Sequence, residues 1–346
     1  MCGLLGLGRA GSANPGQPNP WRILLLVSGC GLFVYLVMRL GAREIARSIV
    51  EIGWYFAIAA AVYMTWELMR ALAYRECIAV SGACPYWDVL RFRLSGEAIQ
   101  FLTSTGPFLA EPAKMWLLRK HGFTAKQAAA ATLCEYLLYM FASVALSAAG
   151  LACFLATFHL SGVAADTALS LLSISAAFLA VSVWAIARRI YVIGTIVKWI
   201  HAIPRIGMRL RFQDQDVQQT EDLMFAVFRD HPRRCLSILA IEAVAQVLLI
   251  FELFVLLAAI KQSTSFYRAF LIEAATKFIS LAFFFIPGQV GAAEGTYALM
   301  FRAMGWPASA GFALAVARRL RSLLAAGLGL MLAPMWRDQP PPAEPR

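Results

Sequence analysis

The sequence predicts an all-α polytopic membrane protein that contains an inverted repeat with two re-entrant, broken-helix hairpins. Three observations carry this prediction: a strongly apolar composition, two Gly/Pro interruptions within apolar stretches, and a match between the residues around those interruptions. Of the 346 residues, 60% are hydrophobic and only 15% are charged. This balance is outside the range of soluble domains and is typical of a polytopic membrane protein.

The second interruption is the more distinctive one. Residues 286–295 read IPGQVGAAEG, after an apolar run of phenylalanine and isoleucine. Pro287 cannot donate a backbone hydrogen bond, and Gly288 and Gly291 allow backbone conformations that other residues avoid. We therefore expect one helix to end here and another to begin near Ala292. Broken backbone at membrane depth is tolerated where it is buried in protein or lines a wet cavity.

A similar device occurs earlier in the chain, where Gly106-Pro107 precedes Glu111. The sequence from Glu111 aligns without a gap on the sequence from Glu294. The alignment places Arg119 on Arg302, Gly122 on Gly305, Phe123 on Trp306 and Ala125 on Ala308. Matching Gly/Pro-interrupted segments in two halves indicate a transporter binding site between repeats. Chance similarity between two alanine- and leucine-rich helices is the alternative, and the matched charged, glycine and aromatic residues count against it.

Apolar runs of the length that a membrane requires predict about six full spans. They cover approximately residues 23–38, 54–73, 126–158, 169–187, 236–260 and 309–335, with the broken regions at 95–118 and 269–304. We expect a transmembrane domain over 21–336, with repeat halves at about 54–158 and 235–335. Residues 1–20 and 337–346 should be disordered. The basic segment 188–234 should be a cytoplasmic loop with an amphipathic helix near 196–203.

Orientation follows from the lysines and arginines of short loops. Segments 188–234 and 119–126 are basic and belong inside, whereas the loop at Asp166 has no basic residue and belongs outside. Both termini are then cytoplasmic, and the two repeat halves run in opposite directions. Arg39, Arg43 and Arg47 fall on the outside, against the rule. The net charge of +11 indicates contact with anionic lipid rather than nucleic acid.

The broken Gly/Pro–Glu segment in each half, with Ile-Pro-Gly-x-x-Gly-x-x-Glu-Gly in the second, resembles the flippase-like membrane domain family. This is the membrane portion of lysylphosphatidylglycerol synthase/flippase proteins. The resemblance covers about residues 20–335 and is strongest at 95–135 and 284–325. It implies a translocase in the cytoplasmic membrane of a prokaryote, which moves a polar or phosphate-bearing lipid between leaflets through a cavity between inverted repeats.

The resemblance carries functional roles to Glu111, Pro287, Gly288, Gly291 and Glu294. Two departures concern the first half. Ala110 precedes Glu111 where the family more often has glycine, and Tyr136 follows Glu135 where arginine is common. The aminoacyl-transferase domain of the bifunctional members has no counterpart in this sequence, so we do not expect lysyl transfer.

Ionisable side chains inside spans are costly and should face a partner or a wet cavity. Glu111 and Glu294 begin the helices after each break, where a helix-capping role is the alternative. Lys114 follows Glu111 by one turn and either pairs with it or binds lipid phosphate. Glu135 and Arg318 occupy the same repeat position, which predicts an ion pair across the repeat axis. Arg318 could also bind a phosphate through two hydrogen bonds.

Other charged residues are expected to pair locally. Glu273 with Lys277, and Glu67 with Arg70, have helical spacing for a salt bridge. Glu97 and Gln100 occupy the entry to the first break, and Glu242 and Glu252 are further candidates for the cavity. The predicted substrate-binding residues are Glu111, Glu294, Glu135, Arg318, Lys114, Glu273 and Lys277, and the predicted gating residues are Gly106, Pro107, Pro287, Gly288 and Gly291.

No catalytic motif is evident, and we expect neither an enzyme nor a cofactor. The histidines have no metal-ligand spacing, the seven cysteines include no C-x-x-C pair, and no phosphate-binding loop follows a strand. Two alternatives to a translocase remain: a non-catalytic membrane partner of a lipid-modifying enzyme, and an intramembrane lipid-modifying enzyme. A hopanoid, an aminoacyl or other phospholipid, and a polyprenyl-linked sugar would all suit the predicted cavity.

Overall fold

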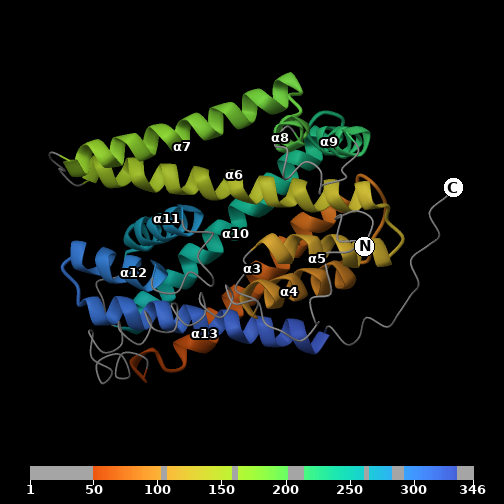
Figure 1. The fold of residues 1–346 in the computed structure, drawn as a ribbon. Coiled ribbons are helices and arrows are strands. Elements are labelled where there is room, and N and C mark those ends of the chain that lie inside the picture. Colours follow the sequence, from red (N-terminus) through yellow and green to blue (C-terminus); the bar gives the residue numbers. More distant parts are fainter. Residues whose placement is uncertain are drawn as a thin grey trace, which may run out of the picture.

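The structure is a computed structural model. It describes residues 50–102, 107–157, 163–201, 214–260, 265–282 and 292–332. Every regular element within these ranges is an α-helix (Figure 1). The predicted first span and both predicted disordered ends lie outside the described residues, as do Gly106, Pro287, Gly288, Gly291 and the three arginines at 39, 43 and 47. Pro107 is the first residue of helix α5.

The chain contains two sets of four consecutive helices, and in each set two shorter helices lie between two longer ones. The first set is α3 (Tyr55–Ile78), α4 (Tyr86–Leu102), α5 (Pro107–Lys120) and α6 (Ala125–Thr157). The second set is α10 (Pro232–Ala259), α11 (Phe266–Ala282), α12 (Ala292–Ala303) and α13 (Ala308–Leu332). Between them lie α7 (Val163–Arg188), α8 (Val192–His201) and α9 (Asp214–Arg229).

The two sets follow the register of the sequence alignment. Ala125 begins α6 and its aligned residue Ala308 begins α13. The turns that precede them contain Gly122 and Gly305, whose φ angles are 93° and 76°. Positive φ favours glycine because it has no side chain to collide with the backbone. Both predicted broken regions therefore consist of two helices, the second of which ends at a left-handed glycine.

Four helices in the described ranges are long and apolar enough to cross a membrane: α3, α6, α10 and the Ala168–Arg188 portion of α7. Their bounds agree with the predicted spans within about five residues at most ends. The predicted last span is also a helix, α13, but it is not one of these four, and it contains Arg318, Arg319 and Arg321. These observations confirm an all-α integral membrane protein.

The packing of the two sets is reciprocal. Helix α3 packs against its counterpart α10, α4 packs against α13, and α11 packs against α6 (Figure 1). Close approaches mark both crossed contacts: a Cβ on Gly329 of α13 would collide with the Leu94 carbonyl of α4, and one on Gly150 of α6 would collide with Ala274 of α11. Each half thus completes its core with a helix from the other half.

The basic segment after α7 is folded onto the bundle. Glu221 of α9 is buried, and its carboxylate accepts hydrogen bonds from the backbone N–H groups of Ile193 and Gly194, at 2.7 and 3.0 Å. These bonds satisfy two of the amides that the start of α8 leaves without helical partners. On α9, Met224 and Val227 are buried in the core formed with α3, α5 and α6. The stretch predicted as a cytoplasmic loop therefore contains two helices anchored to the rest of the molecule.

Candidate functional site

A cavity of about 360 Å³ lies between the two sets of helices. Its wall is contributed by α3, α4, α5 and α6 from the first set and by all four helices of the second. Most of its charged lining residues are cations, and the remainder are glutamates. The cations are Arg70, Arg93, Lys114, Lys277, Arg318, Arg319 and Arg321, and the glutamates are Glu97, Glu111, Glu273 and Glu294.

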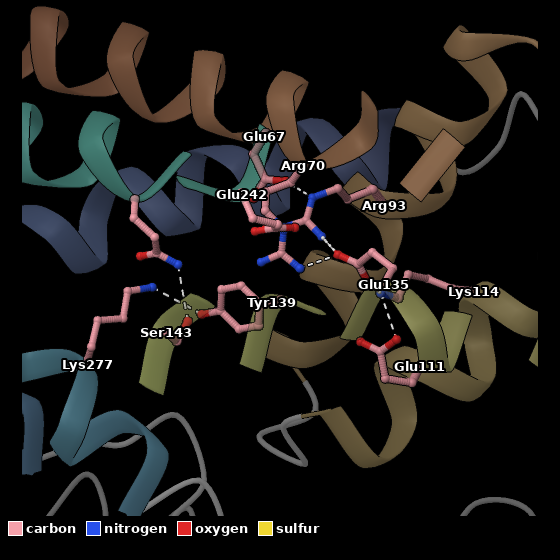
Figure 2. Close-up of polar contacts among 11 residues, drawn as sticks. Glu67, Arg70, Arg93, Glu111, Lys114, Glu135, Tyr139, Ser143, Glu242 and Lys277 are labelled. Atoms are coloured by element: carbon pink, nitrogen blue, oxygen red, sulfur yellow. Dashed lines mark hydrogen bonds and ion pairs between the residues drawn. The ribbon is translucent and has the colours of Figure 1, made fainter. Parts of the chain in front are cut away.

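One side of the cavity is organised by Glu135 of α6, which is fully buried. Its carboxylate accepts a hydrogen bond from Arg70 of α3, from Arg93 of α4 at 3.4 Å and from Lys114 of α5 at 3.2 Å (Figure 2). Three cations from three helices thus converge on one carboxylate. We call this group the Glu135 cluster.

Each cation of the Glu135 cluster also contacts a second carboxylate. Arg70 Nε lies 3.0 Å from Glu242 of α10, Arg93 Nε lies 2.8 Å from Glu67, and Lys114 Nζ lies 2.7 Å from Glu111. Figure 2 shows these carboxylates arranged around the central one. Burial removes the water that would otherwise solvate these charges. Pairing makes the burial tolerable because each charge is surrounded by groups of opposite charge.

The other side of the cavity is organised by Arg318 of α13. Its guanidinium donates to Glu273 of α11 at 2.6 Å, to Glu252 of α10 at 3.1 Å and to the hydroxyl of Tyr297 of α12. The neighbouring arginines extend the group: Arg321 pairs with Glu252, and Arg319 lies 2.9 Å from Glu294. We call this group the Arg318 cluster. Because a guanidinium offers five donors in one plane, it can bind several acceptors at once.

The two clusters are related by position and opposite in charge. Glu135 and Arg318 align in the sequence repeat, and so do Lys114 and Tyr297. Arg93 and Glu273 are the eighth residues of the 17-residue helices α4 and α11. On the remaining pair of helices, α3 contributes Arg70 and α10 contributes Glu252. A central carboxylate with three cations around it in one half therefore corresponds to a central cation with two carboxylates and a tyrosine hydroxyl around it in the other.

Six of the seven predicted substrate-binding residues line the cavity: Glu111, Glu294, Arg318, Lys114, Glu273 and Lys277. Glu135 lies behind the wall and contacts the lining through Arg70, Arg93 and Lys114. The structure thus brings the predicted set to one place, while the binding role of each residue remains a prediction.

The predicted pairings were mostly wrong. Glu135 and Arg318 do not pair with each other, because each is surrounded by opposite charges from other helices. Glu67 pairs with Arg93 and leaves Arg70 to Glu135 and Glu242. Glu273 pairs with Arg318, whereas Lys277 donates to the hydroxyl of Tyr139 at 3.1 Å. The predicted contact of Lys114 with Glu111 is confirmed.

Sequence reasoning missed much of the wall. The cavity is also lined by Trp66, Tyr63, Tyr139 and Arg93. Arg70 contacts both Glu135 and Glu242. Their rings and cations are stacked: the Arg70 guanidinium lies 3.8 Å from the centroid of the Tyr139 ring, and that of Arg321 lies 3.7 Å from the Tyr63 ring. A signal was present for Arg70, which is a cation in an apolar predicted span and is therefore expected to face the protein interior.

Within the described part of the chain, no group of three histidine, cysteine, aspartate or glutamate side chains is arranged to hold a metal ion. The site is thus an array of ion pairs and aromatic rings around a cavity. Such an array can bind a charged ligand by exchanging one of its internal ion pairs for a contact with the ligand.

Comparisons with known proteins complete the description of the site. No curated protein and no solved structure matches the chain. The family described as the lysylphosphatidylglycerol synthase TM region matches residues 21–329, a range that includes every residue of both clusters. With most of its length matched, the chain belongs to the family of lysylphosphatidylglycerol synthase transmembrane regions.

Proposed function

We propose that the protein is a membrane lipid translocase that moves a polar or phosphate-bearing lipid between leaflets. The observation that carries the proposal is the cavity between the two sets of helices, lined by seven cations and four carboxylates. A charged cavity inside an apolar bundle is expensive to maintain and is expected where a polar group must cross. The family match supports a role connected with membrane lipids.

The chemistry of the lining suits a lipid headgroup. Arginine and lysine side chains bind phosphate oxygens through charge-assisted hydrogen bonds. Arg318 and Arg319 line the cavity and are held in place by Glu273, Glu252 and Glu294. Meanwhile the outer surface of helices such as α7 exposes large apolar side chains, including Phe178 and Trp184. Lipid tails would stay beside this apolar surface while the headgroup enters the cavity.

We further propose that the two halves form an inverted repeat with re-entrant hairpins, the arrangement that alternating access uses. Two features of the fold support this. Helices α5 and α12 lie toward opposite ends of the bundle in Figure 1, and the aligned helices α6 and α13 run in opposite directions there. The basic residues near α8 and α9 favour a cytoplasmic position for that end, in a prokaryotic cytoplasmic membrane with both termini inside.

The test is to identify the lipid that the protein retains. Wild-type protein would be purified from its own membrane and examined by native mass spectrometry, beside Glu294→Gln and Asp88→Asn. Glu294 lines the cavity and is fully buried, whereas Asp88 forms a surface pair with Arg91 outside it. We expect one lipid class on the wild type and on Asp88→Asn, and its loss from Glu294→Gln.

Two results would contradict the proposal. One is the absence of any selectively retained lipid on the wild type, and the other is equal retention by all three proteins. Either result would favour a non-catalytic partner that acts through its surface, because such a protein does not depend on the cavity. We propose no catalytic step, since the lining offers ion pairs rather than an activated nucleophile with its base.

A further inference from the structure

Two charged residues of the cavity wall have no oppositely charged partner within ion-pair distance in the described part of the chain: Glu97 and Lys277. The other nine charged lining residues belong to the pairs of the Glu135 and Arg318 clusters. The two adjoining segments, 103–106 and 283–291, contain no ionisable residue in the sequence. Within the described ranges, Glu97 and Lys277 are thus one negative and one positive lining charge that no opposite charge holds.

Both charges are held by tyrosines. The hydroxyl of Tyr63 donates to the Glu97 carboxylate at 3.1 Å, and the ammonium of Lys277 donates to the hydroxyl of Tyr139 at 3.1 Å. A neutral hydroxyl fixes the position of a charge without neutralising it. Each group therefore keeps capacity for a stronger, charge-assisted bond to a ligand.

The same aromatic surface on α3 connects the two groups. Tyr63 stacks on Trp66 with ring centroids 5.0 Å apart, and the Lys277 ammonium lies 5.9 Å from the centroid of the Trp66 ring. Glu97 and Lys277 are also the twelfth residues of the aligned helices α4 and α11. Like Glu135 with Arg318 and Arg93 with Glu273, they carry opposite charges at matching positions of the two halves.

We propose that the cavity selects a zwitterionic phospholipid headgroup, with one phosphate on Lys277 and one ammonium on Glu97. The inference rests on the proposed translocase function and names its substrate class. A headgroup with a phosphate and no ammonium would displace water from the cavity and leave Glu97 without a cation. Leaving a desolvated charge unmatched is unfavourable, so such a headgroup should be disfavoured.

The test uses purified full-length protein in liposomes of digalactosyldiacylglycerol, whose headgroup has neither phosphate nor ammonium, with a trace of a phospholipid that is fluorescent on its acyl chain and has a native headgroup. Two probes are compared, phosphatidylethanolamine and phosphatidylglycerol, and movement between leaflets is followed by quenching from the outside. The variants are Glu97→Gln, Glu97→Asp and Lys277→Gln. The matched controls are Asp88→Asn on α4 and Arg268→Gln on α11, both outside the cavity lining.

We expect the wild type to move the ethanolamine probe about tenfold faster than the glycerol probe, which is the scale of one charge-assisted contact. Glu97→Gln should remove this preference by slowing the ethanolamine probe alone, and Glu97→Asp should retain it. Lys277→Gln should slow both probes, since both carry a phosphate. The controls should behave as the wild type does.

Equal rates for the two probes on the wild type would overturn the inference, as would a preference that survives Glu97→Gln. Neither result would affect the proposed function, because lipid movement would still be observed. Movement of neither probe above that in empty liposomes, by a wild type that also retains no lipid in native mass spectrometry, would overturn the proposed function itself. Retention of a lipid of another headgroup class would overturn the inference alone.

Discussion

The Glu135 and Arg318 clusters occupy equivalent places in the two halves but differ in exposure. The side chain of Glu135 is 0% exposed and lies behind the cavity wall, whereas that of Arg318 is 10% exposed and forms part of the wall. The central carboxylate of the first cluster is therefore placed to hold four helices together, and the central guanidinium of the second is placed to meet a ligand. Two positions that match in the sequence alignment thus carry opposite charges and, on this account, have different tasks.

The largest expected effect on stability is that of Glu135→Gln. Removing the central carboxylate leaves Arg70, Arg93 and Lys114 close together in a buried site, each with a single remaining carboxylate. Breaking a buried ion-pair network in this way destabilises proteins by about 3–5 kcal/mol. A thermal unfolding midpoint well below that of the wild type, measured in detergent, would agree. An unchanged midpoint would show that the Glu135 cluster does not hold the fold.

Arg318→Gln should affect transport more than stability. Glu252 keeps Arg321 as a partner, so the main loss to the fold is the ion pair with Glu273, worth about 1–3 kcal/mol. Lipid movement in proteoliposomes should fall at least tenfold, by about the strength of one charge-assisted contact. Two results together would contradict the different tasks assigned to Glu135 and Arg318. They are an unfolding temperature for Arg318→Gln below that of Glu135→Gln, and lipid movement at the wild-type rate by the folded fraction of Arg318→Gln.

The matched glutamates Glu294 and Glu111 provide a finer comparison. The Glu294 side chain is 1% exposed beside Arg319, and that of Glu111 is 14% exposed beside Lys114. Glu294→Gln should therefore destabilise by about 2 kcal/mol and Glu111→Gln by about 1 kcal/mol, since unmatched charge is more unfavourable where water is excluded. Thermal unfolding of the two variants side by side gives the order, and a reversed order would contradict it.

The smallest effects are expected in the turns, where the two halves should respond alike. Gly122→Ala and Gly305→Ala each place a side chain at positive φ, and nothing lies within 4 Å of the added Cβ at either position. Each should destabilise by about 1 kcal/mol from backbone strain alone. Gly295→Ala is the control, because it has equal space inside α12 without a positive φ. A clear difference between Gly122→Ala and Gly305→Ala would argue against equivalent turns.

The sequence predicted the helices because their signals are local. Apolar runs located α6 and α10, and the glycine and proline residues located the division of each predicted broken region into two helices. The alignment of Glu111 with Glu294 and the charged residues near the two breaks identified six of the eleven charged residues that line the cavity. These signals depend on residues close in sequence or on a match between two stretches, and both can be read without a structure.

Most of the ion pairs could not be predicted because they join helices that are distant in sequence. Helical spacing suggested Glu67 with Arg70 and Glu273 with Lys277. In the structure, Glu67 pairs with Arg93 of α4, and Glu273 pairs with Arg318 of α13. Tertiary packing brings these partners into direct contact in a buried site, where the pairing is stronger than at a solvated helix surface. Glu111 and Lys114 kept the local pairing that spacing predicted.

The central claim is that the cavity between the clusters moves a lipid headgroup across the membrane. Its most direct test is the rate at which the co-purified lipid crosses proteoliposome membranes containing wild type or the double variant Glu111→Gln, Glu294→Gln. The account predicts that the wild type accelerates the crossing of the lipid. With the folded double variant, the lipid should cross no faster than it does in empty liposomes. A double variant as fast as the wild type would contradict it.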